Sequence, residues 1–210
     1  MSNVIVRRAR NTDDIPRIAS CVYLTDPFIY PAAFGTDAHQ AAYAISKLMG
    51  IEDGLFHPDN LAIAFHEEAI CGILLYNKDG AVWDQNQCAD LVHGIVPNSD
   101  NFAYVSEVYF SVESTTPPKD HIEVIACCVM PEFRNMGVGK SMLDWLITNY
   151  PTYTFTLDVL ANNPAAISLY KKFGFQITEA LKGFSMEEST RPDCYHMIRK
   201  PVALGGKSNE

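Results

Sequence analysis

A glycine-rich segment in the middle of the chain has the residue types that bind phosphate. Residues 134–139 are Arg-Asn-Met-Gly-Val-Gly, and they lie between an apolar run at 122–129 and a segment with helical spacing at 140–150. A strand that turns through glycines into a helix presents the unpaired N–H groups of the first helical turn, where the helix dipole adds partial positive charge. Such helix starts bind anions. The segment therefore predicts a phosphate-binding turn.

The glycine spacing argues against two common phosphate motifs. A nucleotide P-loop, G-x-x-x-x-G-K-[ST], would end at Gly139-Lys140-Ser141, but it needs glycine where Arg134 stands. A dinucleotide fingerprint, G-x-G-x-x-G, needs glycine where Met142 stands. A nucleotide-binding protein that uses Gly139-Lys140-Ser141 stays an alternative, and binding of ATP without binding of CoA would support it.

The same segment, which fits [QR]-x-x-G-x-[GA] after a strand ending in V-x-P, resembles the acetyl-CoA site of the GNAT acyltransferase superfamily. In that family the central strand carries a carboxylate six residues before its terminal valine, as Glu123 stands before Val129. A second family pattern, N-x-x-A-x-x-L-Y-x-x-x-G-F, matches residues 163–175. The resemblance covers about residues 120–177. One departure is Met136, where the family often has Arg or Gly, and this removes a basic contact to phosphate but keeps the backbone cradle.

The resemblance implies an α/β fold of the GNAT type, with a mixed, mostly antiparallel, twisted central sheet flanked by helices. It implies one N-acetyltransferase domain over residues 1–202, with the cofactor core at about 120–177 and a disordered tail at 203–210. The implied activity is transfer of the acetyl group of acetyl-CoA directly to a primary amine. A non-catalytic acyl-CoA-binding or sensor domain is the main alternative, and multiple turnover with any amine would separate the two.

The cofactor-binding residues follow from the resemblance. The pyrophosphate is expected on the backbone N–H groups at the helix start, where glycines let the backbone approach closely and Arg134 and Lys140 add charge. The pantetheine arm is expected to pair with the apolar strand, and the region of Val129 to supply an N–H to the thioester oxygen. The candidates are Cys127, Cys128, Val129, Arg134, Asn135, Met136, Gly137, Val138, Gly139, Lys140, Asn163 and Ala166.

Glu123 is the candidate general base. A charged side chain inside an apolar run is costly to bury without a partner or a purpose. Because a lysine-type amine is only ~0.04% neutral at pH 7, a carboxylate that takes its proton, directly or through a water, raises the rate by roughly 10² to 10⁴. Strand alternation predicts that Glu123 shares a face with Cys127 and Val129. The alternative is a salt-bridged glutamate near solvent, and His121 and Glu107 are the reserve candidates for the base.

Tyr170 is the candidate general acid. It follows Asn163 by seven residues and Ala166 by four, which places the three on one helical face. A phenol with a pKa near 10 is protonated at neutral pH and can donate to a departing thiolate. The alternative for Tyr170 is a core tyrosine, and for Asn163 a residue that only caps its own helix.

The acceptor groove is expected beside the first two helices, as the resemblance implies. Phe28, Tyr30 and Phe34 are the candidate substrate residues, and packing of their loop onto the core is the alternative. The acceptor is expected to be a small-molecule or peptide amine, whose identity the sequence leaves open. A homodimer is an open option, because dimers are common in the family.

Composition narrows the class of protein. The net charge of −9 argues against a nucleic-acid partner and agrees with a cationic one, although surface solubility explains it equally well. The apolar runs are too short for a membrane span, and the arginines that follow the first apolar residues do not have the order of a secretory signal. We therefore expect a cytoplasmic protein without a membrane partner. The cysteines form no C-x-x-C pair and the histidines have no metal-site spacing, so no disulfide and no metal are expected.

Apolar periodicity predicts the elements that position these residues. Strands are expected at 4–8, 61–65, 70–76, 122–129, 153–159, 175–178 and 194–199. Helices are expected after the capping residues 11–14, over 37–49 and 140–150, and from Asn163-Pro164 onward. Residues 78–101 are predicted to be a loop or insertion, and 101–114 a helix that covers the site.

Overall fold

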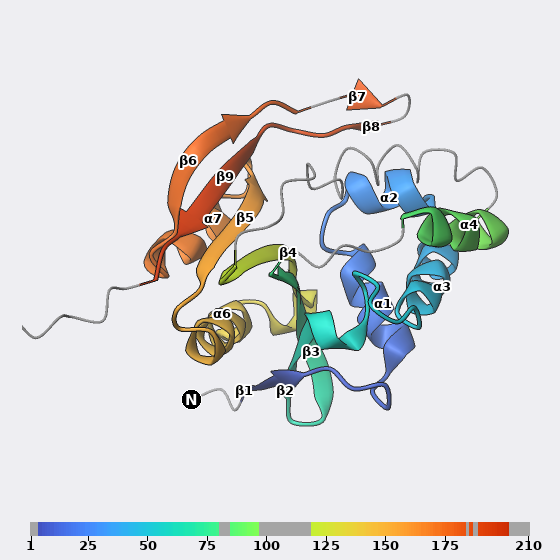
Figure 1. Ribbon diagram of the computed structural model, residues 1–210, viewed down its shortest axis with the longest axis horizontal. Helices are drawn as coiled ribbons and strands as arrows, with labels where there is room; N and C mark the ends of the chain where they lie inside the picture. Colours follow the sequence, from blue (N-terminus) through green and yellow to red (C-terminus); the bar gives the residue numbers. More distant parts are fainter. Residues whose placement is uncertain (1–3, 80–84, 97–118, 184, 187–188, 202–210) are drawn as a thin grey trace, which may run out of the picture.

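Seven strands form one twisted sheet in the order β1-β2-β3-β4-β5-β9-β6 (Figure 1). The structure is a computed structural model that describes residues 4–79, 85–96, 119–183, 185–186 and 189–201. β4 and β5 pair in parallel, and the other neighbouring strands of this sheet pair antiparallel. The strands are β1 Val4–Arg8, β2 Leu61–His66, β3 Ala69–Lys78, β4 His121–Val129, β5 Thr154–Leu160, β6 Gln176–Leu181 and β9 Cys194–Arg199. A separate hairpin pairs β7 Ser185–Met186 with β8 Ser189–Thr190. The predicted fold class is confirmed.

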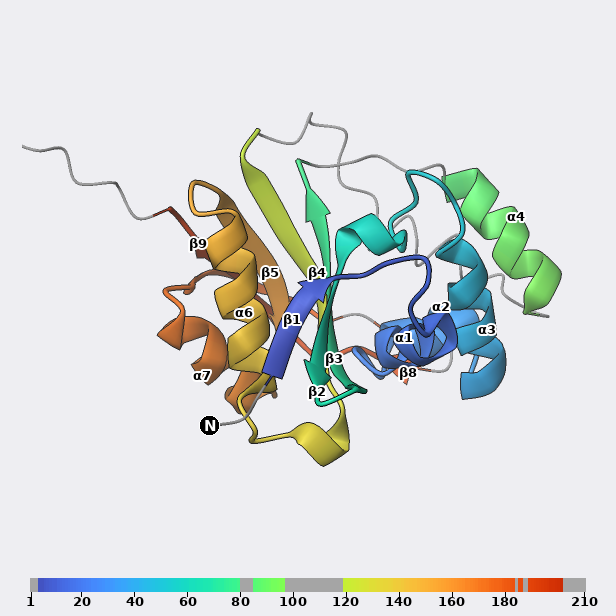
Figure 2. The ribbon, with the colours of Figure 1, turned by 90° about the horizontal axis from the view of Figure 1, so that it is seen from below.

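Helices cover both faces of this sheet (Figure 2). α1, α2 and α3 lie on one face, and α6 and α7 lie on the other. The helices are α1 Ile15–Tyr23, α2 Ile29–Phe34, α3 Ala38–Leu48, α4 Gln85–Ile95, α6 Val138–Asn149 and α7 Pro164–Lys172, with short 3₁₀ turns at Pro58–Asn60 and Pro131–Phe133. None of the helices in the described ranges is long and apolar enough to cross a membrane.

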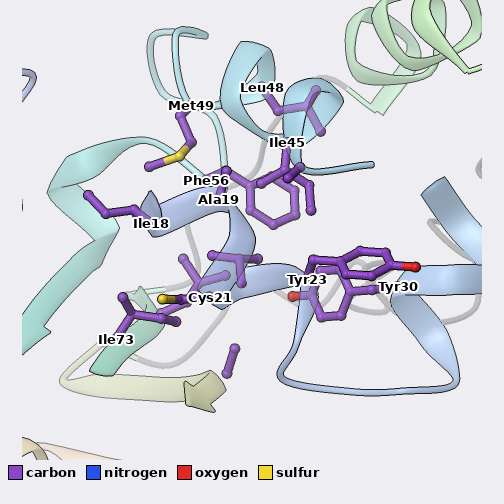
Figure 3. Close-up of a cluster of buried hydrophobic side chains, with 14 of the residues drawn as sticks. Ile18, Ala19, Cys21, Tyr23, Tyr30, Ile45, Leu48, Met49, Phe56 and Ile73 are labelled. Carbon is purple, nitrogen blue, oxygen red and sulfur yellow. The ribbon is translucent and has the colours of Figure 1, made fainter. Parts of the chain in front are cut away.

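The sheet separates two hydrophobic clusters. Along β2, Leu61 and Ile63 face α1 and α3, while Ala62 and Ala64 face α6, because successive strand residues point to opposite faces. Figure 3 shows the first cluster, where side chains of α1 lie between those of α3 and Ile73 of β3. Each face of the central strands is therefore covered, and the side chains at the carboxyl end of β4 are held on a rigid element.

A β-bulge at Ile125 changes the face that β4 presents. β3 pairs Leu75 with Ala126 but Tyr76 with Val124, so Ile125 is an extra residue on β4. Before the bulge, Val124 packs with the α6 cluster; after it, Ala126 packs with the α1 and α3 cluster. Buried and half-buried residues still alternate along the whole strand. The buried residues before the bulge nevertheless face α6, and those after it face α1 and α3.

The bulge places Glu123 and Cys127 on opposite faces of the sheet. Ile122 and Val124 face α6, so Glu123 between them points towards α1 and α2, whereas Cys127 and Val129 pack with the α6 cluster. The expectation that Glu123 shares a face with Cys127 and Val129 is therefore wrong. Strict alternation assumes a regular ladder, and one extra residue reverses the face of everything that follows.

Most predicted elements are confirmed within a residue or two, apart from the later ends of β3 and β6. Two predictions fail. Residues 85–95, assigned to a loop, form α4, and residues 29–34, treated as part of a loop, form α2. The helix predicted at 101–114 and the tail at 203–210 lie outside the described residues.

Candidate active site

The site begins where β4 and β5 separate. Their parallel pairing runs from His121–Thr154 to Val124–Leu157 and stops there, although β4 continues to Val129 and β5 to Leu160. The bulge at Ile125 lies immediately after the last pair, and bulges bend a strand and increase its local twist. Among the residues that the structure describes, the edge of β4 beyond Val124 consequently has no strand partner on the β5 side. An extended group with amide donors and acceptors could pair with that edge.

A cleft occupies this opening and reaches both faces of the sheet. On the α1 and α2 face its lining includes Asp26, Tyr30, Glu123, Asp158 and Arg191. On the α7 face it is lined by Cys127, Asn163, Ala166 and Tyr170. The cleft therefore joins two chemically different sides through the gap between two strands, with carboxylates on one side and a thiol and a phenol on the other.

Glu123 is half-buried on the α1 and α2 side. Burial raises the pKa of its carboxyl group, the negative Asp158 raises it further, and His196 acts in the opposite direction. A carboxylate with a raised pKa is a better proton acceptor than a solvated one. Glu123 therefore has the electrostatic setting of a general base.

Asp158 and His196 form a hydrogen-bonded pair on the same face of the sheet. β5 and β9 pair these two residues directly in register, and Asp158 Oδ1 lies 2.7 Å from His196 Nδ1. The hydrogen bond to Asp158 is the main cause that raises the pKa of His196. Nearby, His121 Nε2 lies 2.8 Å from Thr156 Oγ1, and burial lowers the pKa of His121.

Asp26 and Arg191 join two distant parts of the chain at one end of the cleft. Asp26 Oδ1 accepts hydrogen bonds from the N–H groups of Phe28 and Ile29, where α2 begins, at 2.8 and 3.0 Å. Arg191 Nη2 lies 3.4 Å from Asp26 Oδ2, and both side chains are largely buried. The ion pair ties the segment before β9 to the α1–α2 connection, and both partners line the cleft.

On the α7 side, Tyr170 faces Cys127. Both side chains line the cleft, and burial raises the pKa of Tyr170 well above its usual value. Burial also raises the pKa of the Cys127 thiol, to about 12. Tyr170 thus remains a proton donor at neutral pH, and Cys127 remains a thiol that is a poor nucleophile.

The side chains of α7 are aligned as its sequence predicts. Asn163 caps the helix, with its Oδ1 accepting from the N–H of Ala166 at 3.1 Å, and Pro164 occupies the first turn. Asn163, Ala166 and Tyr170 then line one side of the cleft. The cap explains the presence of Asn163 without a ligand.

The predicted phosphate turn has the backbone of an anion cradle. Asn135 and Gly137 adopt positive φ values of 63° and 82°, and α6 begins at Val138. The hydrogen bonds of α6 begin where Ser141 donates its N–H to the carbonyl of Gly137 at 2.9 Å. The N–H groups before Ser141 belong to the first turn and come before this series of bonds. A Cβ at Gly139 would lie 3.1 Å from Leu169 Cδ2, which shows how closely α6 approaches α7. The turn therefore has the backbone shape that the glycine spacing predicts, and phosphate binding there stays a prediction.

Several predicted residues lie away from the centre of the cleft. Cys128 points to the α1 face, unlike its neighbour Cys127, and Lys140 is exposed with its Nζ 2.7 Å from Asp144. Phe34 is 1% exposed and packs against Tyr30 and Phe56 in the core, and it is not part of the lining of the described cleft. Phe28 is half-buried, and of the three aromatic candidates Tyr30 lines the cleft. Glu107, a reserve candidate for the base, lies outside the described residues.

The sequence-based prediction misses the charged lining residues Asp26, Asp158 and Arg191, and also His196, which pairs with Asp158. Asp158 carries the same signal as Glu123, since it is a charged residue inside the apolar strand 154–160. His196 and Arg191 have no local signal, because they reach the site only through the pairing of β9 with β5.

Comparisons with known proteins agree with this geometry. Residues 37–175, well over half of the chain, match the model of the family described as "Acetyltransferase (GNAT) family". Over 87 residues the chain is 28% identical to the L-amino acid N-acetyltransferase AaaT of Escherichia coli (strain K12), covering 40% of this chain and 54% of that protein. The chain thus spans about half the length of this curated relative.

Solved structures with a similar fold are also found. An N-acetyltransferase from Staphylococcus aureus Mu50 aligns with a TM-score of 0.64 and 17% identity, covering 93% of this chain and all of that one. A GNAT family acetyltransferase from Elizabethkingia anophelis with acetyl-CoA bound aligns with a TM-score of 0.53 and 14% identity, covering 95% and 99% of the two chains. These structures support the fold, and the family match shows that the chain belongs to the GNAT acetyltransferase family.

Proposed function

We propose that the protein is an N-acetyltransferase that moves the acetyl group of acetyl-CoA directly to a primary amine. The observation that carries this proposal is the opening between β4 and β5, which has Glu123 on one side and Tyr170 on the other. A reaction that removes a proton from a nucleophile and gives one to a leaving group needs such an arrangement. The family match and the acetyl-CoA bound by a structural neighbour support the choice of acyl donor.

The residues on the α6 and α7 side would hold acetyl-CoA. Its phosphates fit the turn before α6, where Gly137 and the first helical N–H groups form the cradle and Arg134 adds a nearby exposed charge. The pantetheine amides fit the unpaired edge of β4 near Cys127 and Val129. The bound thioester supplies the electrophilic carbonyl.

The protein's own groups then move the protons. Glu123 takes a proton from the acceptor amine, directly or through a water, as the amine attacks. Tyr170, kept protonated by burial, donates to the departing thiolate. The high pKa of Cys127, about 12, favours direct transfer over an acetylated cysteine intermediate.

The acceptor side favours an amine that arrives as an ammonium ion. Glu123 and Asp158 both line this part of the cleft, and their like charges raise the pKa of Glu123. An ammonium group between them would relieve this repulsion. The E. coli relative is an L-amino acid N-acetyltransferase, which makes amino acids one class of acceptor to test.

The first experiment tests binding and turnover separately. Acetyl-CoA is titrated calorimetrically with ATP as the control, and then acetylated product is measured by mass spectrometry for L-amino acids, a peptide with a free N-terminus, and spermidine. The proposal expects acetyl-CoA binding without ATP binding, and multiple turnover with at least one amine. Binding without turnover would indicate a sensor domain instead, and heat with ATP alone would indicate a nucleotide-binding protein.

The second experiment replaces the base. Glu123→Gln should lower kcat by roughly 10² to 10⁴ while acetyl-CoA affinity stays unchanged, and Glu68→Gln on an exposed turn is the matched control. Burial raises the pKa of Glu123 in the folded protein. At a pH above the ordinary carboxyl pKa, the charged Glu123 therefore lowers the free energy of unfolding. The Gln variant should therefore be at least as stable as the wild type at neutral pH. Unchanged turnover across the pH range would remove Glu123 from this role.

A further inference from the structure

The proposed reaction releases a proton on the acceptor side of the sheet. An ammonium acceptor and acetyl-CoA give an amide, the free thiol of CoA and one proton: an N–C and an S–H bond form, and a C–S bond and two N–H bonds break. The thiolate leaves and is protonated on the Tyr170 side, whereas the amine loses its protons on the Glu123 side. Glu123 is half-buried and must lose the proton it takes before the next turnover.

The Asp158–His196 pair lies on the same side of the cleft as Glu123 and is exposed to solvent. Glu123 is opposite Thr156 in the parallel ladder, and Asp158 is two residues further along β5, about 6.6 Å by strand rise. Both carboxylates line the same cleft, and His196 is hydrogen-bonded to Asp158 on the strand beyond. The side chains of His196 and Asp158 are 31% and 39% exposed, so the pair reaches bulk water.

The charges around His196 suit a group that gains and loses a proton. Asp158 on β5, Glu123 on β4 and Glu179 on β6 all raise the pKa of His196 from its ordinary value, and burial acts in the opposite direction. The remaining titratable neighbour is His121 on β4, whose pKa is lowered by burial and by His196. Histidine is the side chain whose ordinary pKa lies nearest to neutrality.

We propose that Asp158 and His196 form the outlet by which Glu123 returns its proton to solvent. This inference rests on the proposed acetyltransferase function. The two residues act through Glu123: they hold the hydrogen-bonded route along which its proton leaves. The geometry that carries the inference is the 2.7 Å pair, its shared face with Glu123 and its exposure to water.

The test compares His196→Asn with the wild type, using whichever of the L-amino acid, peptide or spermidine acceptors is turned over. At low buffer concentration kcat should fall roughly tenfold or more, with acetyl-CoA affinity unchanged, and the acidic limb of the kcat–pH profile should move. Added imidazole should restore the rate of the variant, because a soluble proton carrier replaces the missing side chain. The wild type should be insensitive to buffer concentration.

Two further variants keep the result interpretable. Asp158→Asn retains the imidazole but removes its partner, and it should show the same buffer-dependent rescue if His196→Asn does not fold. His39→Asn removes an exposed histidine of α3 and should behave as the wild type. A folded His196→Asn variant with a wild-type pH profile and no rescue would overturn the outlet alone. A wild-type protein that acetylates none of the amines would overturn the proposed function and the outlet with it.

Discussion

The two sides of the cleft are built in different ways. The cofactor side comes from contiguous segments, with the turn at 134–140 opening α6 and residues 163–170 forming one face of α7. The acceptor side gathers Asp26, Glu123, Asp158 and Arg191 from segments far apart in the chain. The first side depends on local backbone geometry, and the second depends on strand pairing and on the bulge in β4.

On the basis of this difference, we propose separate functions for the two sides. The cofactor side presents backbone N–H groups, a thiol and a phenol, which suit a constant ligand with phosphates and amides. The acceptor side presents carboxylates and a guanidinium held by an ion pair, which suit a polar ligand whose identity can differ between relatives. Changes on the first side should therefore alter acetyl-CoA binding or thiolate departure, and changes on the second should alter the acceptor.

Removal of the Tyr170 hydroxyl should have the largest effect of the variants considered next. Tyr170→Phe keeps the packing against Phe175 but removes the proton donor, so kcat should fall by about 100-fold with acetyl-CoA affinity nearly unchanged. The matched control is Tyr76→Phe, a buried tyrosine of β3 whose hydroxyl bonds the carbonyl of Asp59 away from the cleft. Full activity of the Tyr170 variant in a steady-state assay would mean that solvent, and not Tyr170, protonates the thiolate.

Gly137→Ala should weaken acetyl-CoA binding by about tenfold. Its φ of 82° is a left-handed conformation that costs an L-residue roughly 1–2 kcal/mol, and relief of that strain would rotate the N–H groups away from the phosphates. Gly94→Ala makes the same change inside α4, where a Cβ meets open space, and should leave affinity unaltered. An unaltered calorimetric dissociation constant for Gly137→Ala would contradict the cradle.

Arg191→Ala should raise the acceptor KM by a few-fold and leave acetyl-CoA affinity unchanged. The variant removes the ion pair with Asp26 and so loosens the connection that carries Tyr30. Arg17→Ala is the control, because it breaks an ion pair with Glu132 that lies outside the cleft. A change in acetyl-CoA affinity instead of acceptor KM would mean that the two sides are not separable at this residue.

The smallest effect concerns stability and its dependence on pH. The pKa of His196 is raised in the folded protein, so its pairing with Asp158 stabilises the fold below the ordinary histidine pKa and loses this effect as pH rises through the folded value. Asp158→Asn should lower the free energy of unfolding by about 0.5 kcal/mol at pH 5.5, a small value because the pair is partly exposed. At pH 8.5 this loss of unfolding free energy should vanish. The variant also removes the charge of Asp158 that repels Glu123, which reduces the loss further. A pH-independent difference in urea denaturation would argue against a charged His196.

The sequence predicts the local backbone of the proposed cofactor side well, for a physical reason. Glycines at a strand-to-helix turn, the Asn163 cap and the spacing of Ala166 and Tyr170 are local signals, and each produces the expected backbone. The acceptor side escapes prediction because Asp158 meets His196 through cross-strand register. The face of Glu123 depends on one extra residue in β4, which the alternating pattern of buried residues conceals.

A crystal structure with CoA bound tests the central claim most directly, since the claim is that acetyl transfer takes place in the opening between β4 and β5. The account predicts that the phosphates lie on the N–H groups before α6 and that the thiol lies in the opening, within contact of Cys127 and Tyr170. Glu123 should then face the thiol from the opposite side of the sheet. A CoA thiol bound outside this opening, with no path to Glu123, would contradict the account.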